Sequence, residues 1–337
     1  MAQDYAGAVR AGAMAASRLH RDLGIRDASD SAAGAIDVFA AIHQLDVPLM
    51  LRPLKGLMGA FLNDPCPGIL IGTGWRMNIQ RFTAAHELGH CILKHKPSLD
   101  DEDQILRRVP LAVDARNDYQ ETEADAFAVG FMLPKWLIVG HCARQGWRTA
   151  DLLRPEVVYQ LSLRLGASYE ATCRTLERYR LVNVDQRDVL LRTKPKPIKV
   201  ELLRDYQPAN YKGDVWLLTD RDQGARIDGS RDDLFVVRLE ERSTAGYVWN
   251  FDELQTSGFA LLRDVRENDD PEGVGGPVAR RVTAAPEDGP RGRLELAERR
   301  PWQPDAPIAK LGLDFDFSGP EELGLSRVER RQMLEAA

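Results

Sequence analysis

The chain has 337 residues, which is long enough for two ordinary domains. Its formal net charge of −6 argues against general affinity for nucleic acid or for anionic membranes. Four cysteines without paired spacing favour free thiols in a reducing compartment. Because the chain also lacks a signal peptide and an apolar run of membrane-spanning length, we expect a cytoplasmic protein without a membrane partner.

Two amphipathic helices are expected at the start of the chain, over about 5–23 and 35–45. Two short strands follow, near 47–52 and 68–72. Asn78 then offers an N-cap for a third helix, which carries the most informative motif of the sequence.

That motif is His86-Glu-Leu-Gly-His90, with two histidines four residues apart and Glu87 directly after the first. On a helix, positions i and i+4 lie on one face, so both imidazoles can reach the same tetrahedral zinc. Glu87 can then reach a metal-bound water as a general base. The pattern predicts metal-dependent peptide hydrolysis, and the alternative is a pair of histidines hydrogen-bonded in a core.

A catalytic zinc needs a third protein ligand, and the best source is a second helix near 121–133 that stops at Pro134. We assign Glu121 as this ligand, and we expect Asp125, one turn later, to accept a hydrogen bond from a ligating histidine. Glu123 is the competing ligand, but it lies about 160–200° round the helix from Glu121, so both cannot face the metal. Residues 96–118 between the two helices are expected to form a polar connection.

The set of two histidines and one glutamate favours Zn2+, and manganese or iron also fits such ligands. A bound zinc would polarise the scissile carbonyl, and Glu87 would pass a proton from water to the leaving amine. Tyr119, His95 and Arg81 are candidates for stabilising the oxyanion, and their spacing selects none of them. His95 is expected to be a surface histidine.

Residues from about 5 to 183 resemble the ImmA/IrrE family of zinc metallopeptidases. The shared sequence includes Arg81-Phe-Thr and a helix that reads Glu-x-Glu-Ala-Asp-x-Phe-Ala and ends in Met-Leu-Pro. The family's metal ligands correspond to His86, His90 and Glu121, and its general base corresponds to Glu87. The resemblance implies a site-specific cut in a helix-turn-helix repressor, with a role in transcription regulation and the stress response.

Helices are also expected near 151–166 and 169–180, and together they resemble a helix-turn-helix. Residues 141–200 carry twelve Lys and Arg against six Asp and Glu, which raises a DNA-contact hypothesis. Helix pairs of this shape usually only pack, and no base-reading motif is present. Lys194-Pro-Lys-Pro197 is interpreted as a stiff, extended linker.

Beyond the linker, short β-rich runs near 215–219, 234–239 and 258–262 are punctuated by Gly, Asp and Pro, which predicts a β-sandwich. The predicted fold class is therefore α+β: a mostly helical zincin-like domain with a small sheet, then helix-turn-helix-like helices, then an immunoglobulin-like sandwich. The expected divisions are 1–140 for the metallopeptidase core, 141–192 for the helical extension, 193–204 for the linker, 205–305 for the sandwich and 306–337 for a tail with a possible helix.

Residues from roughly 205 to 305 resemble the chagasin family of cysteine-peptidase inhibitors, and three short segments in this range resemble the family's loops. In that family, three loops gather at one end of the sandwich and wedge into a peptidase cleft. The first loop departs from the family pattern, because Arg242-Ser-Thr-Ala-Gly-Tyr247 replaces Asn-Pro-Thr-Thr-Gly-Tyr. The candidate protein-binding residues are Thr244, Gly246, Tyr247, Gly275, Gly276, Arg300, Pro301 and Trp302. We expect Trp249 to be a core residue instead.

Two classes of function therefore compete. The first is an endopeptidase whose second domain recruits a polypeptide, senses a protein partner or blocks the metal site until a signal arrives. The second is a non-catalytic regulatory protein with structural zinc, or a cytoplasmic peptidase inhibitor. A tail helix that includes Leu323, Leu325 and Val328 could dock on either domain, and a frayed terminus is equally compatible with the sequence.

Overall fold

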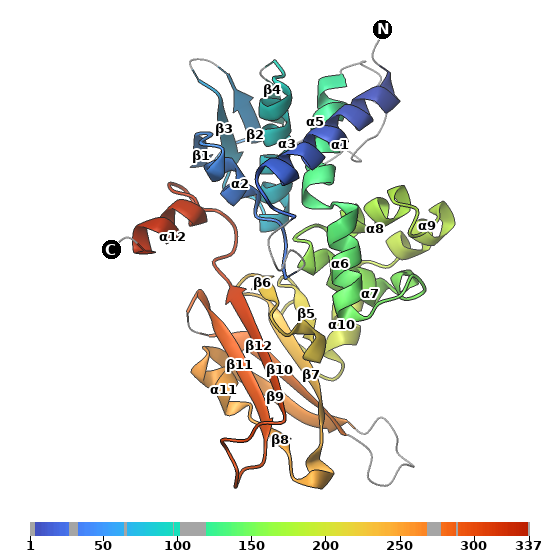
Figure 1. Cartoon of the computed structure of the whole chain (residues 1–337), viewed down its shortest axis with the longest axis vertical. Coiled ribbons are helices and arrows are strands. Elements are labelled where there is room, and N and C mark those ends of the chain that lie inside the picture. The colour runs from blue at the N-terminus through green and yellow to red at the C-terminus, as the bar shows by residue number, and fades with distance from the viewer. Residues whose placement is uncertain are drawn as a thin grey trace.

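The computed structural model describes residues 4–26, 33–63, 66–96, 98–101, 119–267, 278–287 and 289–335. A helical part with a small sheet lies at one end, and a β-sandwich lies at the other (Figure 1). The predicted α+β class, with a helical first part and a sandwich second part, is confirmed.

Three helices form the centre of the first part: α1 (Tyr5–Asp22), α3 (Met77–Leu93) and α5 (Tyr119–Met132). Small residues let them approach closely. A Cβ on Gly12 of α1 would lie 2.1 Å from the carbonyl oxygen of Glu123, and a Cβ on Gly89 of α3 would lie 3.1 Å from Phe127. Gly12 therefore lets α1 approach α5, and Gly89 brings α3 and α5, the two helices with the candidate ligands, into direct contact.

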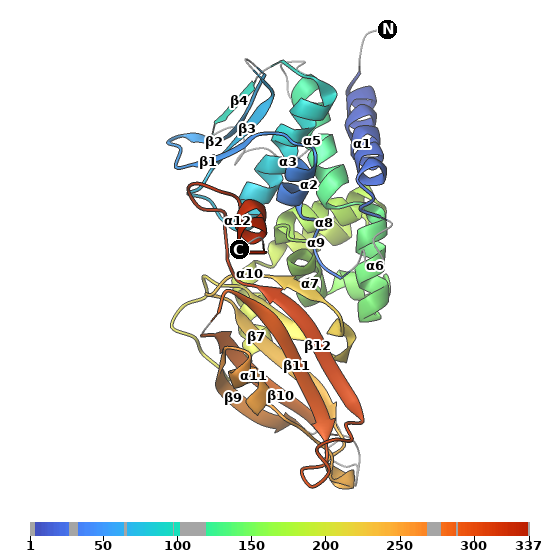
Figure 2. The same ribbon diagram turned by 60° about the vertical axis from the view of Figure 1, so that its left-hand side comes forward.

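A four-stranded sheet in the order β1-β3-β2-β4 lies beside α3 (Figure 2). Strand β1 (Leu49–Arg52) pairs in parallel with β3 (Gly68–Gly72), and β2 (Leu57–Leu62) is antiparallel to β3. At the edge, β4 (Ser98–Asp101) is antiparallel to β2. Strands β2 and β4 were not among the predicted elements. Helix α2 (Val38–Gln44) lies within the predicted range 35–45.

Helix α3 begins one residue before the predicted N-cap. Its N-cap is Arg76, which makes no side-chain capping bond, so the assignment of Asn78 as the cap is wrong. The remaining helices of this part are α6 (Lys135–Gln145), η1 (Asp151–Leu153), α7 (Pro155–Arg164), α8 (Tyr169–Arg178), α9 (Val184–Arg192) and α10 (Pro195–Leu203).

Helix α10 occupies the segment that we interpreted as an extended linker, so that prediction is wrong. Pro195 is the first residue of the helix, where its missing N–H costs nothing and its fixed φ suits the first turn. Pro197 also lies in the first turn. The prolines of Lys194-Pro-Lys-Pro197 therefore start a helix.

Among the described residues, the helical stretch Tyr119–Gln145 has the length and apolar composition of a membrane span, and 61% of its apolar 18-residue window is buried inside the protein. The stretch comprises α5 and α6, with Pro134 at the N-cap of α6. Core helices of folded domains share this composition. This stretch by itself therefore does not indicate a membrane.

The sandwich consists of two four-stranded sheets, in the orders β5-β7-β10-β9 and β6-β12-β11-β8. Its strands are β5 (Val215–Leu218), β6 (Arg226–Asp228), β7 (Leu234–Glu241), β8 (Val248–Trp249), β9 (Phe259–Glu267), β10 (Val278–Pro286), β11 (Arg291–Arg299) and β12 (Ala309–Asp316). Helices η2 (Asp220–Asp222), η3 (Ser243–Ala245) and α11 (Asp252–Thr256) lie in its connections. Phenylalanines from facing strands fill the core, and Trp249 is buried with them, as predicted.

The two parts contact each other directly. From α7, Tyr159 Oη donates to Asp214 Oδ1 at 2.8 Å, and Gln160 Nε2 donates to the carbonyl oxygen of Val215 at 2.7 Å. The segment after β12 returns to the first part, where Gln80 and Glu321 exchange two hydrogen bonds, and it ends in α12 (Arg327–Glu335). The tail is thus anchored beside the beginning of α3.

Candidate metal centre

His86, His90 and Glu121 meet where α3 and α5 cross, and their ligand atoms all lie within 4.8 Å of one another. The two histidine Nε2 atoms are 3.0 Å apart. The Glu121 carboxylate lies 3.3 Å from His86 Nε2 and 3.5 Å from His90 Nε2. The structure therefore brings the three predicted ligands to one point from two separate helices.

The donor set fits a zinc ion. Donors held about 2.0–2.1 Å from a tetrahedral zinc are roughly 3.3–3.4 Å apart, and the three donor separations scatter around that value. Two imidazoles and one carboxylate are also a ligand set of catalytic zinc sites that leave a fourth position for water or substrate. The same set would accept manganese.

The protonation states agree with metal binding. Burial lowers the pKa of His90, so this imidazole is neutral at pH 7. Burial opposes the charged form of Glu121, but its interactions with the two adjacent histidines outweigh that effect and hold the pKa of its carboxyl well below the usual value. The site therefore offers a neutral His90 imidazole and an ionised Glu121 carboxylate, the forms that bind a cation.

Asp125 lies behind the first histidine. Its Oδ1 is 2.9 Å from His86 Nδ1, the ring nitrogen on the side away from Glu121. Both residues are buried. A carboxylate in this place fixes the tautomer that leaves Nε2 unprotonated for a metal.

Glu123, the alternative ligand, is turned to a different partner. Its Oε2 lies 2.7 Å from His95 Nε2, and His95 is buried, so the expectation of a surface histidine is wrong. The turn after α3 folds His95 back beneath His90, which sequence spacing along a continuing helix did not predict.

The other candidates for oxyanion stabilisation also have defined surroundings. Arg81 is 2% exposed, and its guanidinium pairs with Asp228 of the sandwich at 3.1 Å. It therefore holds the two parts together. Tyr119 begins α5 and is half-buried. The four cysteines are free thiols, and burial raises the pKa of Cys91.

Glu87 is 1% exposed and lies against strand β2. A Cβ added to Gly59 of β2 would lie 3.1 Å from Glu87 Oε1 and 2.4 Å from Thr83 Cγ2. Gly59 therefore leaves room for the candidate general base.

Gly59→Ala is expected to destabilise the protein by about 1–3 kcal/mol, because the new methyl group would overlap Thr83 and press on Glu87. Urea unfolding measures this change. Gly74→Ala is the matched control, because a Cβ on Gly74 meets nothing within 4 Å. Equal stability of the two variants would contradict the close packing of β2 on Glu87.

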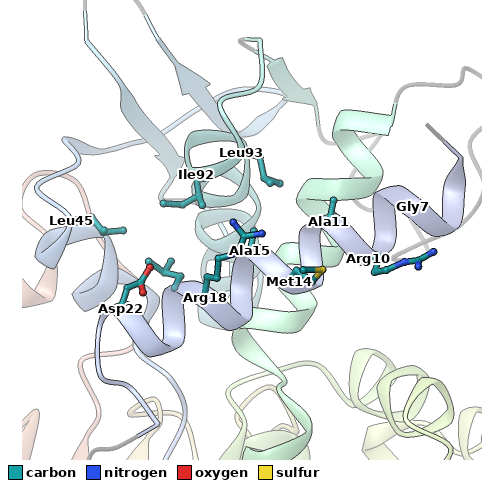
Figure 3. Close-up of a pocket in the computed structure, with 11 residues that line it drawn as sticks. Gly7, Arg10, Ala11, Met14, Ala15, Arg18, Asp22, Leu45, Ile92 and Leu93 are labelled. Atoms are coloured by element: carbon teal, nitrogen blue, oxygen red, sulfur yellow. The ribbon is translucent and has the colours of Figure 1, made fainter. Parts of the chain in front are cut away.

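A groove of about 620 Å³ runs along α1, where Arg10 and Arg18 flank Met14, Ile92 and Leu93 (Figure 3). None of the candidate metal ligands lines it. The groove is therefore separate from the candidate metal centre.

Two of the predicted sandwich loops contact each other. The Arg300 guanidinium lies 4.5 Å from the centre of the Tyr247 ring, and its Nε donates to the carbonyl oxygen of Ala245 at 3.3 Å. A Cβ on Gly246, where φ is +79°, would lie 2.7 Å from Trp302. Glycine therefore suits both the backbone turn and the indole packed beside it.

Several residues of these two loops are exposed. Trp302 is 67% exposed, and Thr244 and Pro301 are also exposed. Gly275 and Gly276, the predicted members of the glycine-rich loop, lie outside the described residues. Large exposed aromatic side chains of this kind anchor protein interfaces.

Comparison with known proteins gave matches for both parts. Residues 43–177 match the Peptidase_M78 family, described as an IrrE N-terminal-like domain, and residues 230–315 match chagasin family peptidase inhibitor I42. The first range lies inside the resemblance predicted over 5–183, and the second overlaps the one predicted over 205–305.

Among curated proteins, Amoebiasin-2 of Entamoeba histolytica is 30% identical over 91 residues, which cover 26% of this chain and 73% of that protein. Among solved structures, the cysteine protease inhibitor EhICP2 from Entamoeba histolytica is 24% identical, with 32% of this chain and 99% of that chain covered and a TM-score of 0.28. PbICP-C in complex with falcipain-2 is 11% identical, with 33% and 96% covered and a TM-score of 0.22.

Proposed function

The chain belongs in its first part to the IrrE N-terminal-like peptidase family and in its second to the chagasin peptidase-inhibitor family, and from this pairing we propose that it is a zinc-dependent endopeptidase with a protein-recognition domain. The observation that carries the proposal is the meeting of His86, His90 and Glu121 at one point. Glu87, buried on the same helix, would be the general base.

A zinc ion held there would supply a Lewis acid for the scissile carbonyl and lower the pKa of an attacking water. The protein's own residues do the rest. His86 and His90 present their Nε2 atoms, while Asp125 fixes the ring of His86. Glu87 takes a proton from the attacking water and gives it to the amine as the peptide bond breaks.

We propose that the substrate is a cytoplasmic regulatory protein, with a helix-turn-helix repressor as the first candidate and transcription control in the stress response as the role. This rests on the sequence resemblance over residues 5–183. A helix-turn-helix repressor from the same cell, incubated with the full chain and zinc, should yield two fragments. Intact repressor after prolonged incubation with a chain that cleaves other peptides would remove this substrate.

The position of the loops favours recognition over self-inhibition. The loop that holds η3 and the loop between β11 and β12 lie at the end of the sandwich away from the helical part (Figures 1 and 2). Both loops therefore lie at the opposite end of the molecule from α3 and α5, the helices that carry the candidate metal centre. Of the alternatives considered, blocking of the metal centre in the same molecule is the least compatible with this arrangement.

A distinct outcome is expected for Trp302→Ala, because Trp302 is exposed and belongs to the loop between β11 and β12, which lies at the end of the sandwich away from the helical part. Cleavage of short peptides should stay within about twofold of wild type, whereas cleavage of a protein substrate should fall by about tenfold or more through KM. Met333→Ala, at another exposed residue, is the control.

Three results would redirect the assignment. A rise in short-peptide cleavage would favour self-inhibition, and unchanged protein cleavage would remove the recognition role. Inhibition of papain by the full chain, lost in Trp302→Ala, would favour the alternative of a peptidase inhibitor.

A further inference from the structure

His95 is a buried histidine beside the candidate metal centre. It is 6% exposed, its Nδ1 lies 2.9 Å from His90 Nδ1, and its Nε2 lies 2.7 Å from Glu123 Oε2. Glu123 of α5, His95 and His90 therefore form a continuous hydrogen-bonded chain, which reaches the candidate ligand His90 at Nδ1. His95 lies on the side of His90 away from Glu121.

The backbone that delivers His95 has a rare conformation for a residue with a side chain. Lys94, the C-cap of α3, is left-handed with φ 57° and ψ 43°. The N–H of His95 then donates to the carbonyl oxygen of His90 at 3.0 Å, as in a Schellman motif. Glycine usually occupies this position, and Lys94 adopts it in a turn that places His95 against His90.

The hydrogen bonds allow one consistent assignment of protons. A ligating His90 has no proton on Nε2, so its Nδ1 carries the proton and donates to His95 Nδ1. His95 then accepts at Nδ1 and carries its own proton on Nε2, which donates to Glu123 Oε2. Each ring nitrogen thus has a defined role, and the hydrogen-bonded chain ends on a carboxylate.

The arrangement gives each candidate histidine ligand its own support from α5. Asp125 contacts His86 directly, whereas Glu123 reaches His90 through the His95 ring. Glu121, Glu123 and Asp125 therefore serve one centre from three positions on a single helix. Glu123 lies on the far side of α5 from Glu121, and it acts on the same site because the His95 ring lies between Glu123 and His90.

We propose that His95 and Glu123 are positioning residues for the metal centre, which hold His90 in the tautomer and ring orientation that present Nε2 to the metal. This inference rests on the proposed zinc site. Groups in this place typically change metal affinity by about 10–100-fold when they are removed.

The test is zinc affinity of the full chain, measured by competition with a chelator of known affinity. His95→Ala should weaken zinc binding by about 10–100-fold with the stoichiometry unchanged. His95→Asn, whose side-chain oxygen can accept the bond from His90 Nδ1, should recover part of the loss. Glu123→Gln should fall between His95→Ala and wild type. His43→Ala, at an exposed histidine, should match wild type.

A second readout separates positioning from general stability. The visible spectrum of the cobalt-loaded protein reports the ligand geometry, and it should change in His95→Ala but not in His43→Ala. Unchanged affinity and spectrum in His95→Ala would overturn the inference, as would complete loss of zinc, which would make His95 a ligand. A wild-type chain that binds no zinc would instead remove the proposed metal centre itself.

Discussion

Replacing Glu87 with glutamine is expected to lower peptide cleavage by about 10²–10⁴-fold while zinc stays bound, because a positioned general base contributes that much to the rate. Glutamine keeps the size of the side chain but cannot accept the proton of the attacking water. Glu87 is buried against β2 and is absent from the ligand cluster, so its loss should leave metal affinity unchanged.

The measurement pairs two quantities on the same preparation: zinc content, and cleavage of a peptide pool from the cell's own proteins followed by mass spectrometry. Glu170→Gln on α8, with a side chain 60% exposed, is the matched control and should cleave normally. Full cleavage by Glu87→Gln would exclude Glu87 as the base. A wild-type chain that binds zinc and cleaves nothing would favour structural zinc.

Asp222→Ala is expected to destabilise the protein by about 3–5 kcal/mol, because it leaves a buried cation without its partner. The side chains of Arg164 and Asp222 are 6% and 2% exposed, and their charged groups are 2.7 Å apart. Gln145 also donates to the same carboxylate at 2.7 Å. This cluster joins α6 and α7 to the sandwich.

Urea unfolding of the full chain measures the loss, with Asp220→Ala, at an exposed residue of the same short helix, as the control. The double variant Arg164→Met with Asp222→Leu should recover most of the stability, because it removes both charges from the interface. A change below about 1 kcal/mol in Asp222→Ala would place the ion pair in the class of weak surface pairs.

Local periodicity accounts for what the sequence predicted about the metal centre. His86 and His90 share a helix face by spacing alone, and the same argument separates Glu121 from Glu123 on α5. What spacing along a helix cannot predict is a change of direction. The left-handed turn at Lys94 brings His95 to His90, and no pattern of apolar residues signals that turn.

In the fold as well, local sequence patterns predicted some elements and missed others. Strand β3 was predicted to the residue, because the short length of its apolar run and the glycines at both ends favour a strand over a helix. Helix α10 was misread because two prolines indicate an extended segment as readily as a first turn. The contact of Arg81 with Asp228 joins residues far apart in the chain, so it required the tertiary structure.

The central claim is that two imidazoles and one carboxylate from separate helices hold a catalytic cation. X-ray absorption at the zinc K edge of the full-length, zinc-loaded protein tests it most directly. We predict one zinc per chain, surrounded by nitrogen and oxygen donors only, about 2.0–2.1 Å away and including two imidazoles. A sulfur donor, a third imidazole or no bound zinc would contradict the assignment of His86, His90 and Glu121.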